Sequence, residues 1–128
     1  MIINIRTKEI IDVSQGCGHE HDFGVYKRTI GIKINESIVV YVDLGYVGIN
    51  EFHENSKVPK KASKLHPLSD KEKAYNKRLA RKRVVVEHIN AKIKTFKIMA
   101  YPYRNHCRRH QLRAFLICGI INYEKKVK

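Results

Sequence analysis

The feature that most constrains the fold is a long proline-free stretch between Pro67 and Pro102. It opens with the sequence SDKE, a capping box in which Ser69 accepts from the backbone N–H of Glu72 while the Glu72 side chain reaches back. We therefore expect a helix from about residue 70 to about residue 97. Its apolar residues recur at helical intervals and form one stripe: Tyr75, Leu79, Val86, Ile89, Ile93 and Phe96.

Upstream of this helix the sequence predicts strands and a short helix. Residues 1–14 alternate loosely and are rich in Ile and Val, which favours one strand or two strands joined by a tight turn. Residues 22–29 predict a short helix capped by Asp22. The run 38–42 is apolar at consecutive positions, which is typical of a strand buried on both faces in a parallel sheet.

Turns, a loop and a last helix complete the pattern. Gly45 and Gly48 are expected to turn the chain, and residues 53–68 hold two of the three prolines and four lysines, which predicts an irregular basic loop. A final helix is expected to begin near Asn105, with Leu112, Phe115, Leu116 and Tyr123 as its inner face. The predicted fold class is α/β, with N-terminal strands followed by C-terminal helices.

The composition indicates a single globular domain. The chain has 128 residues, 43% of them hydrophobic, and no apolar run approaches the ~20 residues that a membrane span needs. The start MIINIRTKEI lacks the basic head and apolar stretch of a secretory signal, so a cytoplasmic protein is expected. Three cysteines, far apart and odd in number, argue against a disulfide framework.

The charge is distributed unevenly. Residues 1–56 carry five bases against eight acids, net −3, whereas residues 57–128 carry 21 bases against four acids, net +17. A basic half of this size indicates a polyanion partner, with a nucleic acid favoured. Binding to DNA would make the protein nucleoid-associated. The alternative is a solvated basic surface without a partner.

Two carboxylates stand where a site could form. Asp43 follows the predicted buried strand, and ligands of open α/β sheets bind beyond the carboxyl ends of strands; alternatively, Asp43 starts a turn before Gly45. Glu87 lies about 100° around the helix from the apolar stripe, one turn after Arg83 and two turns before Lys94. Its alternative is a weak surface pair with Arg83.

Such a pair of acids would suit a hard cation. Mg²⁺ and Mn²⁺ prefer carboxylate oxygens, and two-ion phosphoryl chemistry normally uses about three such groups. Two are accounted for by Asp43 and Glu87. Asp12 and Asp22 are the upstream candidates for a third.

Two groups of residues have the side-chain types of zinc ligands. They are Cys17, His19 and His21, and His106, Cys107 and His110. The first lies on alternate positions but lacks the fourth ligand that closed zinc sites use, and the second is more typical of a basic helix start. Cys118, between Ile117 and Gly119, is expected to be a core thiol.

Several motifs together resemble a known family. They are HDFGVYK around Asp22, VYVDLGYVGI around Asp43, the R-x3-E-x6-K spacing of Arg83, Glu87 and Lys94, PYRN, and the closing LRAFLICGIINYE. In order and spacing they resemble the C-terminal half of DDE transposases of bacterial insertion sequences, in the group related to Harbinger-type transposases. The resemblance covers about residues 2–124, which makes 1–124 a partial catalytic domain and 125–128 a basic tail.

The resemblance implies a fold, a metal and a site. The fold would be a partial ribonuclease H-like domain, which cuts and rejoins DNA with two divalent metals, Mg²⁺ or Mn²⁺, held by an Asp, Asp, Glu triad. Asp43 would be the second Asp and Glu87 the Glu, and Asp22 could assist. The implied contacts to DNA phosphates are Arg83, Lys94, Lys60, Lys61, Arg104, Arg108 and Arg109.

The sequence departs from the family pattern in two ways. Ala80 stands where the family usually has a Tyr, three residues before the Arg, and the strand of the first catalytic Asp would precede Ile2. The resemblance therefore implies a truncated or split transposase, inactive alone unless Asp22 or Asp12 replaces the first Asp. Its expected partners are transposon DNA ends, a full-length transposase or an upstream-frame product, and no membrane. The alternative function is a non-catalytic module that binds DNA or a transposase.

Overall fold

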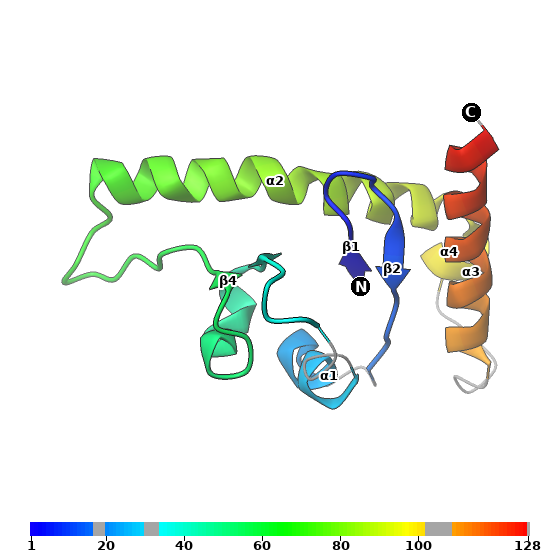
Figure 1. Cartoon of the computed structure of the whole chain (residues 1–128), viewed down its shortest axis with the longest axis horizontal. Coiled ribbons are helices and arrows are strands. Elements are labelled where there is room, and N and C mark those ends of the chain that lie inside the picture. The colour runs from blue at the N-terminus through cyan, green and yellow to red at the C-terminus, as the bar shows by residue number, and fades with distance from the viewer. Residues whose placement is uncertain (17–19, 30–33, 102–108, 128) are drawn as a thin grey trace. The chain divides into compact units, whose positions relative to one another are not determined.

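A computed structural model describes residues 1–16, 20–29, 34–101 and 109–127. The elements in chain order are β1 (Ile2–Ile3), β2 (Ile10–Asp12), α1 (Asp22–Thr29), β3 (Val40–Tyr41), the 3₁₀ turns η1 (Leu44–Tyr46) and η2 (Ile49–Glu51), β4 (Ser56–Lys57), α2 (Asp70–Lys94), α3 (Lys97–Ala100) and α4 (His110–Val127) (Figure 1). They form two compact units: residues 1–15 with 84–128, and residues 16–83. The mixture of helices and strands confirms the α/β class.

The first unit begins with a small antiparallel hairpin. β1 pairs with β2, with Ile2 opposite Asp12 and Ile3 opposite Ile10. The Asn4 side chain shapes the turn between them, because its Oδ1 accepts from the backbone N–H groups of Arg6 at 2.9 Å and Thr7 at 3.2 Å. Of the two alternatives for residues 1–14, two strands joined by a tight turn is confirmed.

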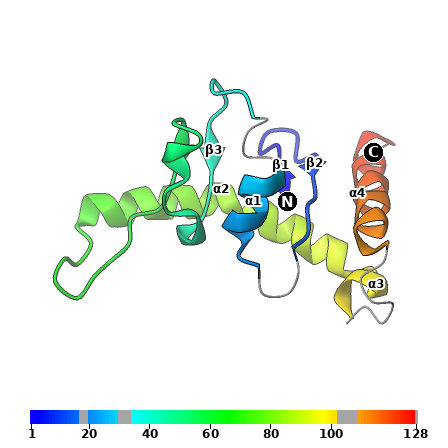
Figure 2. The ribbon, with the colours of Figure 1, turned by 90° about the horizontal axis from the view of Figure 1, so that it is seen from below.

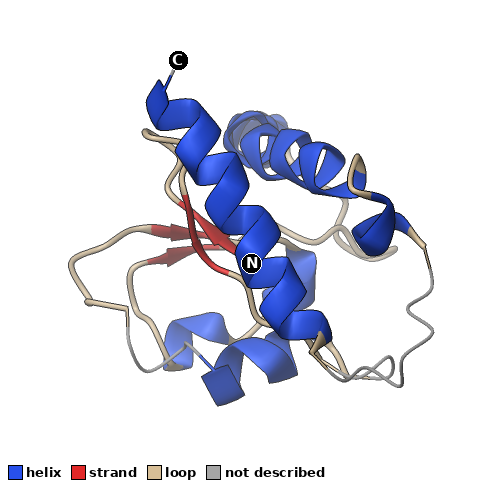
Figure 3. Cartoon of the chain, turned by 90° about the vertical axis from the view of Figure 1, so that its right-hand side faces the viewer, coloured by secondary structure: helices blue, strands red, loops and turns tan. Residues whose placement is uncertain are grey.

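Helix α4 lies beside β2 and covers the core of the first unit (Figure 3). The Asn122 side-chain amide of α4 makes two hydrogen bonds to the backbone of Ile10 in β2. It donates to the Ile10 carbonyl at 2.8 Å and accepts from the Ile10 N–H at 2.9 Å. This saturates backbone groups that an edge strand would otherwise leave open. The buried core consists of Ile10, Val13, Ile89, Ile93, Ala114, Ile117, Cys118 and Ile121.

The predicted inner face of α4 is wrong. The helix begins at His110, the predicted start at Asn105 lies outside the described residues, and the buried side chains are Ala114, Ile117, Cys118 and Ile121. Leu112, Phe115, Leu116 and Tyr123 are all exposed. The helix is apolar on both faces, so periodicity alone cannot choose between them. The buried face carries the small side chains of Ala114 and Cys118, which let the helix backbone come close to its neighbours.

The second unit contains a short parallel pair. β3 pairs with β4 in parallel, with Val40 opposite Ser56 and Tyr41 opposite Lys57. The parallel partner confirms one part of the prediction for residues 38–42, but burial on both faces is wrong, because Ile38 and Val39 are 53% and 40% exposed. A strand is buried on both faces only where layers cover both, and a two-residue ladder gives it little cover.

Two other local predictions need small corrections. The helix at 22–29 is confirmed as α1, but it starts with Asp22, and the carbonyl that accepts its first bond, from Val25 N–H at 3.1 Å, is that of His21. The basic loop at 53–68 is irregular as expected, except for β4 and for His53, which is buried and lies 3.3 Å from the Ser56 hydroxyl.

Helix α2 is a single uninterrupted helix of 25 residues (Figure 2). Its capping box is confirmed: Ser69 Oγ accepts from Glu72 N–H at 3.3 Å, and Glu72 Oε2 accepts from Ser69 N–H at 2.9 Å. Its predicted apolar stripe is also confirmed, since all six residues are buried or half-buried. The helix ends at Lys94 rather than near 97, because the Thr95 hydroxyl donates to the carbonyl of Lys92 at 2.7 Å and competes with the helical bond.

No helix in the described part of the chain combines the length and apolar character needed to span a bilayer.

Candidate functional site

Asp43 lies two residues after the end of β3 and caps the first 3₁₀ turn. Its Oδ1 accepts from the backbone N–H of Gly45 at 2.9 Å, which satisfies a donor that the turn leaves free. The turn that follows needs Gly48, whose φ of 91° favours glycine. The turn-initiating role that the sequence allowed for Asp43 is therefore confirmed, and it occupies one of the two carboxylate oxygens.

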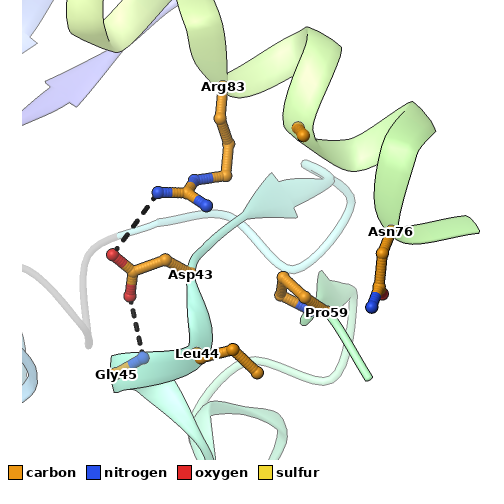
Figure 4. Close-up of a pocket in the computed structure, with 7 residues that line it drawn as sticks. Asp43, Leu44, Gly45, Pro59, Asn76 and Arg83 are labelled. Atoms are coloured by element: carbon orange, nitrogen blue, oxygen red, sulfur yellow. Dashed lines mark hydrogen bonds and ion pairs between the residues drawn. The ribbon is translucent and has the colours of Figure 1, made fainter. Parts of the chain in front are cut away.

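The other oxygen points toward Arg83, and Asp43 is one of the residues that line an open pocket (Figure 4). Asp43 Oδ2 lies 3.6 Å from Arg83 Nη2, and the side chains of Asp43 and Arg83 are 43% and 34% exposed. The pocket is lined by Asp43, Leu44, Gly45, Pro59, Asn76, Ala80 and Arg83. Its volume of about 400 Å³ is enough for a hydrated cation, since one water takes roughly 30 Å³.

Two consecutive residues of α2, Lys82 and Arg83, contact Tyr41 and Asp43, which lie two positions apart in the β3 segment, residues 40–43. Lys82 Nζ donates to the Tyr41 hydroxyl at 2.7 Å and lies 4.2 Å from the centre of its ring, while Arg83 meets Asp43. Because residues two apart on a strand share a face, Tyr41 and Asp43 both point at the helix. The sequence prediction missed this pairing, although the spacing of the two residues was a signal for it.

A second set of contacts ties the basic loop to α2. The Asn76 amide accepts from Lys60 N–H at 2.8 Å and donates to Lys60 C=O at 2.9 Å, and the Tyr75 hydroxyl donates to Val58 C=O at 3.4 Å. These bonds fix the backbone and leave the Lys60 and Lys61 side chains exposed. Two of the predicted phosphate contacts are thus presented from an anchored segment near the pocket.

Tyr46 lies close enough to Asp22 and Asp43 for both carboxylate charges to affect its pKa. Burial is the main cause that raises the pKa of its phenol to about 12, and the charges of Asp22 and Asp43 contribute to the same rise because they disfavour another negative charge. Its ring also contacts the ring of Phe23 in α1, with centroids 5.6 Å apart. The structure therefore brings Asp22, at the start of α1, to the same neighbourhood as Asp43.

Glu87 and Lys94 belong to the first unit. Both are exposed on α2, and in the described part of their unit neither carries a hydrogen bond or an ion pair. Asp43 belongs to the second unit, so the distance between the Asp43 and Glu87 carboxylates stays a prediction. Arg109 is exposed and has a φ of 62°. Arg104 and Arg108 lie outside the described residues.

The remaining candidates are less suited to metal binding. Among the described residues no group of three or more His, Cys, Asp or Glu is placed to hold an ion. Asp12 is half-buried in β2, and its Oδ2 is buried without a hydrogen-bond partner in the described structure. Cys118 is a buried free thiol, as expected, and burial raises its pKa. Cys17, His19, His106 and Cys107 fall outside the described residues.

Comparison with known proteins places the chain in a family. The family model described as DDE superfamily endonuclease matches residues 1–122. The chain belongs to the DDE superfamily endonucleases. Its sequence is also 43% identical, over all 128 residues, to a protein of Microchaete diplosiphon named as a probable transposase for insertion sequence element IS702. No solved structure matches.

The DDE chain covers 46% of the length of that relative. It is similar to a part of a transposase, and the family membership confirms the resemblance of its motifs. The position where the family usually has a Tyr is Ala80, an exposed residue that lines the pocket.

Proposed function

We propose that the chain contributes two metal-binding carboxylates, Asp43 and Glu87, to a DDE transposase that cuts and rejoins DNA. The observation that carries the proposal is the position of Asp43: it lies two residues after a strand of a parallel pair, it caps a turn, and it lines an open pocket with its Oδ2 directed to Arg83 of a basic helix. Membership of the DDE endonucleases makes a metal-dependent nuclease the natural use of such a carboxylate.

The donor set fits a hard divalent cation, Mg²⁺ or Mn²⁺, because carboxylate oxygen is the ligand that both prefer. When bound, such ions stabilise the charge that develops on the attacking and leaving oxygens of a phosphodiester. Asp43 and Glu87 would hold the ion, and Asp22 would assist. In this proposal the third carboxylate comes from residues outside the chain, and the 128 residues form part of a ribonuclease H-like domain, with 125–128 as a basic tail.

The basic residues would position the DNA. Arg83, Lys94, Lys60, Lys61 and Arg109 are the candidates within the described residues, and Arg104 and Arg108 complete the proposed set. Contacts to phosphates fix the register of a protein on DNA without reading its sequence. Proposed partners are therefore transposon ends and the remainder of a transposase, as a full-length copy or an upstream-frame product.

A second candidate function is a DNA-binding or transposase-binding module without chemistry. It is favoured by one observation, the net charge of +17 over residues 57–128, which needs no metal to attract DNA. The two functions differ in whether Asp43 and Glu87 bind an ion.

Paramagnetic broadening by Mn²⁺ tests the main proposal. In a ¹⁵N-labelled chain, submillimolar Mn²⁺ should broaden the amide signals of both Gly45 and Glu87. Because one ion would be shared, Asp43→Asn should abolish the broadening at Glu87, and Glu87→Gln should reduce it at Gly45. Each substitution should weaken Mn²⁺ binding at least tenfold, since even the loss of a residue that only orients a metal ligand costs about that much.

The matched control is Glu51→Gln, which removes an exposed carboxylate from the neighbouring turn η2. It should leave both the broadening and the affinity unchanged. If Asp43→Asn leaves the broadening at Glu87 unchanged and Glu87→Gln leaves the broadening at Gly45 unchanged, the two carboxylates do not share an ion. The non-catalytic binding module then becomes the better account.

A further inference from the structure

The two oxygens of Asp43 have different surroundings. Oδ1 accepts the Gly45 N–H at 2.9 Å and is therefore committed to the turn. Oδ2 has no bond to the backbone in the described structure, belongs to a side chain that is 43% exposed, and lies 3.6 Å from Arg83 Nη2 (Figure 4). Oδ2 is thus the oxygen that a cation from solvent could bind, and the Arg83 guanidinium already lies beside it.

The contact between Arg83 and Asp43 is one that a metal could displace. At 3.6 Å it is longer than the 2.7 to 2.9 Å typical of charge-assisted hydrogen bonds. Both side chains are more than a third exposed, so water and salt weaken the pair. A divalent ion carries twice the charge and binds carboxylate oxygen directly, so it should win the competition.

The surroundings allow Arg83 to leave without moving its helix. Lys82, the preceding residue, is held at Tyr41, and Asn76 is held at both backbone groups of Lys60. These hydrogen bonds fix the position of this part of α2 relative to the β3 segment and the basic loop. Release of Arg83 therefore requires only rotation of its own long side chain.

We infer that Arg83 is a positioning residue that acts as a removable counter-ion: without metal it neutralises Asp43 Oδ2, and the arriving cation displaces it. This rests on the proposed role of Asp43 as a metal ligand. The displaced guanidinium stays within a side chain's length of the metal. There its planar fork suits two oxygens of a DNA phosphate, so metal loading would make Arg83 available to the substrate.

Titration with Mn²⁺ of the full chain, followed by calorimetry, tests the inference. Arg83→Gln removes the competing cation and should tighten Mn²⁺ binding about two- to fivefold, the range expected for a half-exposed ion pair. The matched control is Arg81→Gln, which removes the same charge from an exposed position on the same helix. It should change the affinity less than Arg83→Gln does.

A second readout follows Arg83 itself. In the wild-type chain, diamagnetic Mg²⁺ should shift the Nε–Hε signal of Arg83, and in Asp43→Asn the signal should not respond. Circular dichroism confirms that each variant is folded. A purely structural Arg83 would give no tightening on substitution and no metal-dependent shift.

The outcomes separate this inference from the proposed function. If Asp43→Asn abolishes Mn²⁺ binding but Arg83→Gln leaves it unchanged or weaker, the counter-ion role is overturned and Asp43 remains a ligand. If Asp43→Asn binds Mn²⁺ as the wild type does, both are overturned. Equal tightening by Arg81→Gln and Arg83→Gln would show a general charge effect and would also overturn the counter-ion role.

Discussion

Asp43 combines an observed structural task with a proposed chemical one in a single carboxylate. The Gly45 N–H holds Oδ1 at 2.9 Å and so restricts the side-chain rotamer, while Oδ2 is directed to Arg83. A ligand held in place before the ion arrives loses less conformational freedom on binding. The turn and the proposed metal site are therefore not competing explanations for this residue, because each uses a different oxygen.

Gly45→Ala tests this arrangement at the residue scale. A Cβ at position 45 would stand 3.1 Å from Asp43 Oδ1, so the carboxylate must shift by a few tenths of an ångström. We expect Mn²⁺ affinity to fall about two- to fivefold, equivalent to a weakened hydrogen bond. Calorimetry measures the affinity, and the position-45 amide proton should move upfield as its bond lengthens.

The control for Gly45→Ala is Gly119→Ala, where nothing lies within 4 Å of the added Cβ. That variant should bind Mn²⁺ like the wild type, and its stability should rise by about 0.5 to 1 kcal/mol because alanine favours the helix. An unchanged affinity in Gly45→Ala would show that the position of Oδ1 is irrelevant to the site.

At the scale of elements, α2 depends on its capping box, and the box depends on pH. The Ser69 N–H and hydroxyl donate to the Glu72 carboxylate, and these bonds lower the pKa of Glu72. Because the folded pKa is the lower one, the stabilisation is present above the ordinary value of 4.5 and is lost as the pH falls through the lowered value. Glu72→Gln should remove this acid-dependent loss.

Amide hydrogen exchange in the first turn of α2, measured between pH 3 and pH 6, reports the effect. Ser69→Ala should destabilise the helix start by about 1 kcal/mol above pH 5, and its effect should shrink as the pH falls, because the hydroxyl that it removes donates to the Glu72 carboxylate. Asp70→Asn, which removes an exposed acid paired only with Lys73 among the described residues, serves as the control. Equal pH dependence in Glu72→Gln and the wild type would contradict the assignment of the effect to Glu72.

The contrast between α2 and α4 shows what sequence can predict about elements. The start and inner face of α2 followed from a capping box and a single apolar stripe, since its other positions are mostly charged. Helix α4 is apolar all round, so its buried face was decided by packing against β2 and was missed. The burial of β3 was overestimated for the same reason, because an apolar run does not say how many layers cover it.

The candidate site was predictable to the extent that local chemistry defines it. Motifs pointed to Asp43 and to the strip of Arg83, Glu87 and Lys94, and the position of Asp43 before Gly45 pointed to its turn. The contacts of Lys82 with Tyr41 and of Asn76 with Lys60 span 41 and 16 residues, and no local pattern encodes such distances. Pairings of that kind emerge only when the elements pack.

At the scale of the whole molecule, the distribution of charge predicts how the chain meets DNA. Residues 57–128 carry a net charge of +17, so we expect binding to duplex DNA that tolerates any sequence and weakens steeply with salt. Neutralising Z phosphates gives log K a slope of about −0.9Z against log salt concentration. Fluorescence anisotropy at several salt concentrations measures this slope.

A charge-removing variant of the basic loop sharpens that test. Lys60→Gln combined with Lys61→Gln should reduce the salt slope by about 2, since each lysine is proposed to neutralise one phosphate. Glu51→Gln, which adds net positive charge on another turn, should not reduce it. A flat salt response of the wild-type chain would remove DNA as the partner of this surface.

The last prediction concerns catalysis by the 128-residue chain alone. In the proposed site, Asp43 and Glu87 are two carboxylates where two-ion phosphoryl chemistry uses about three. With a ligand missing, an ion is held with too little charge and too loose a geometry to orient the attacking oxygen. We therefore expect no nicking of supercoiled plasmid by the purified chain with Mg²⁺ or Mn²⁺, although Mn²⁺ still binds in the relaxation experiment.

Glu87→Gln controls for contaminating nuclease in this assay, and Asp22→Asn and Asp12→Asn test the two aspartates that could replace the missing ligand. Asp22 is the stronger of these, because it shares the neighbourhood of Tyr46 with Asp43, whereas Asp12 lies half-buried in β2. Metal-dependent nicking that is lost in both Glu87→Gln and Asp22→Asn would overturn the prediction. It would also identify α1 as the source of the third ligand, and the site would then be complete within this chain.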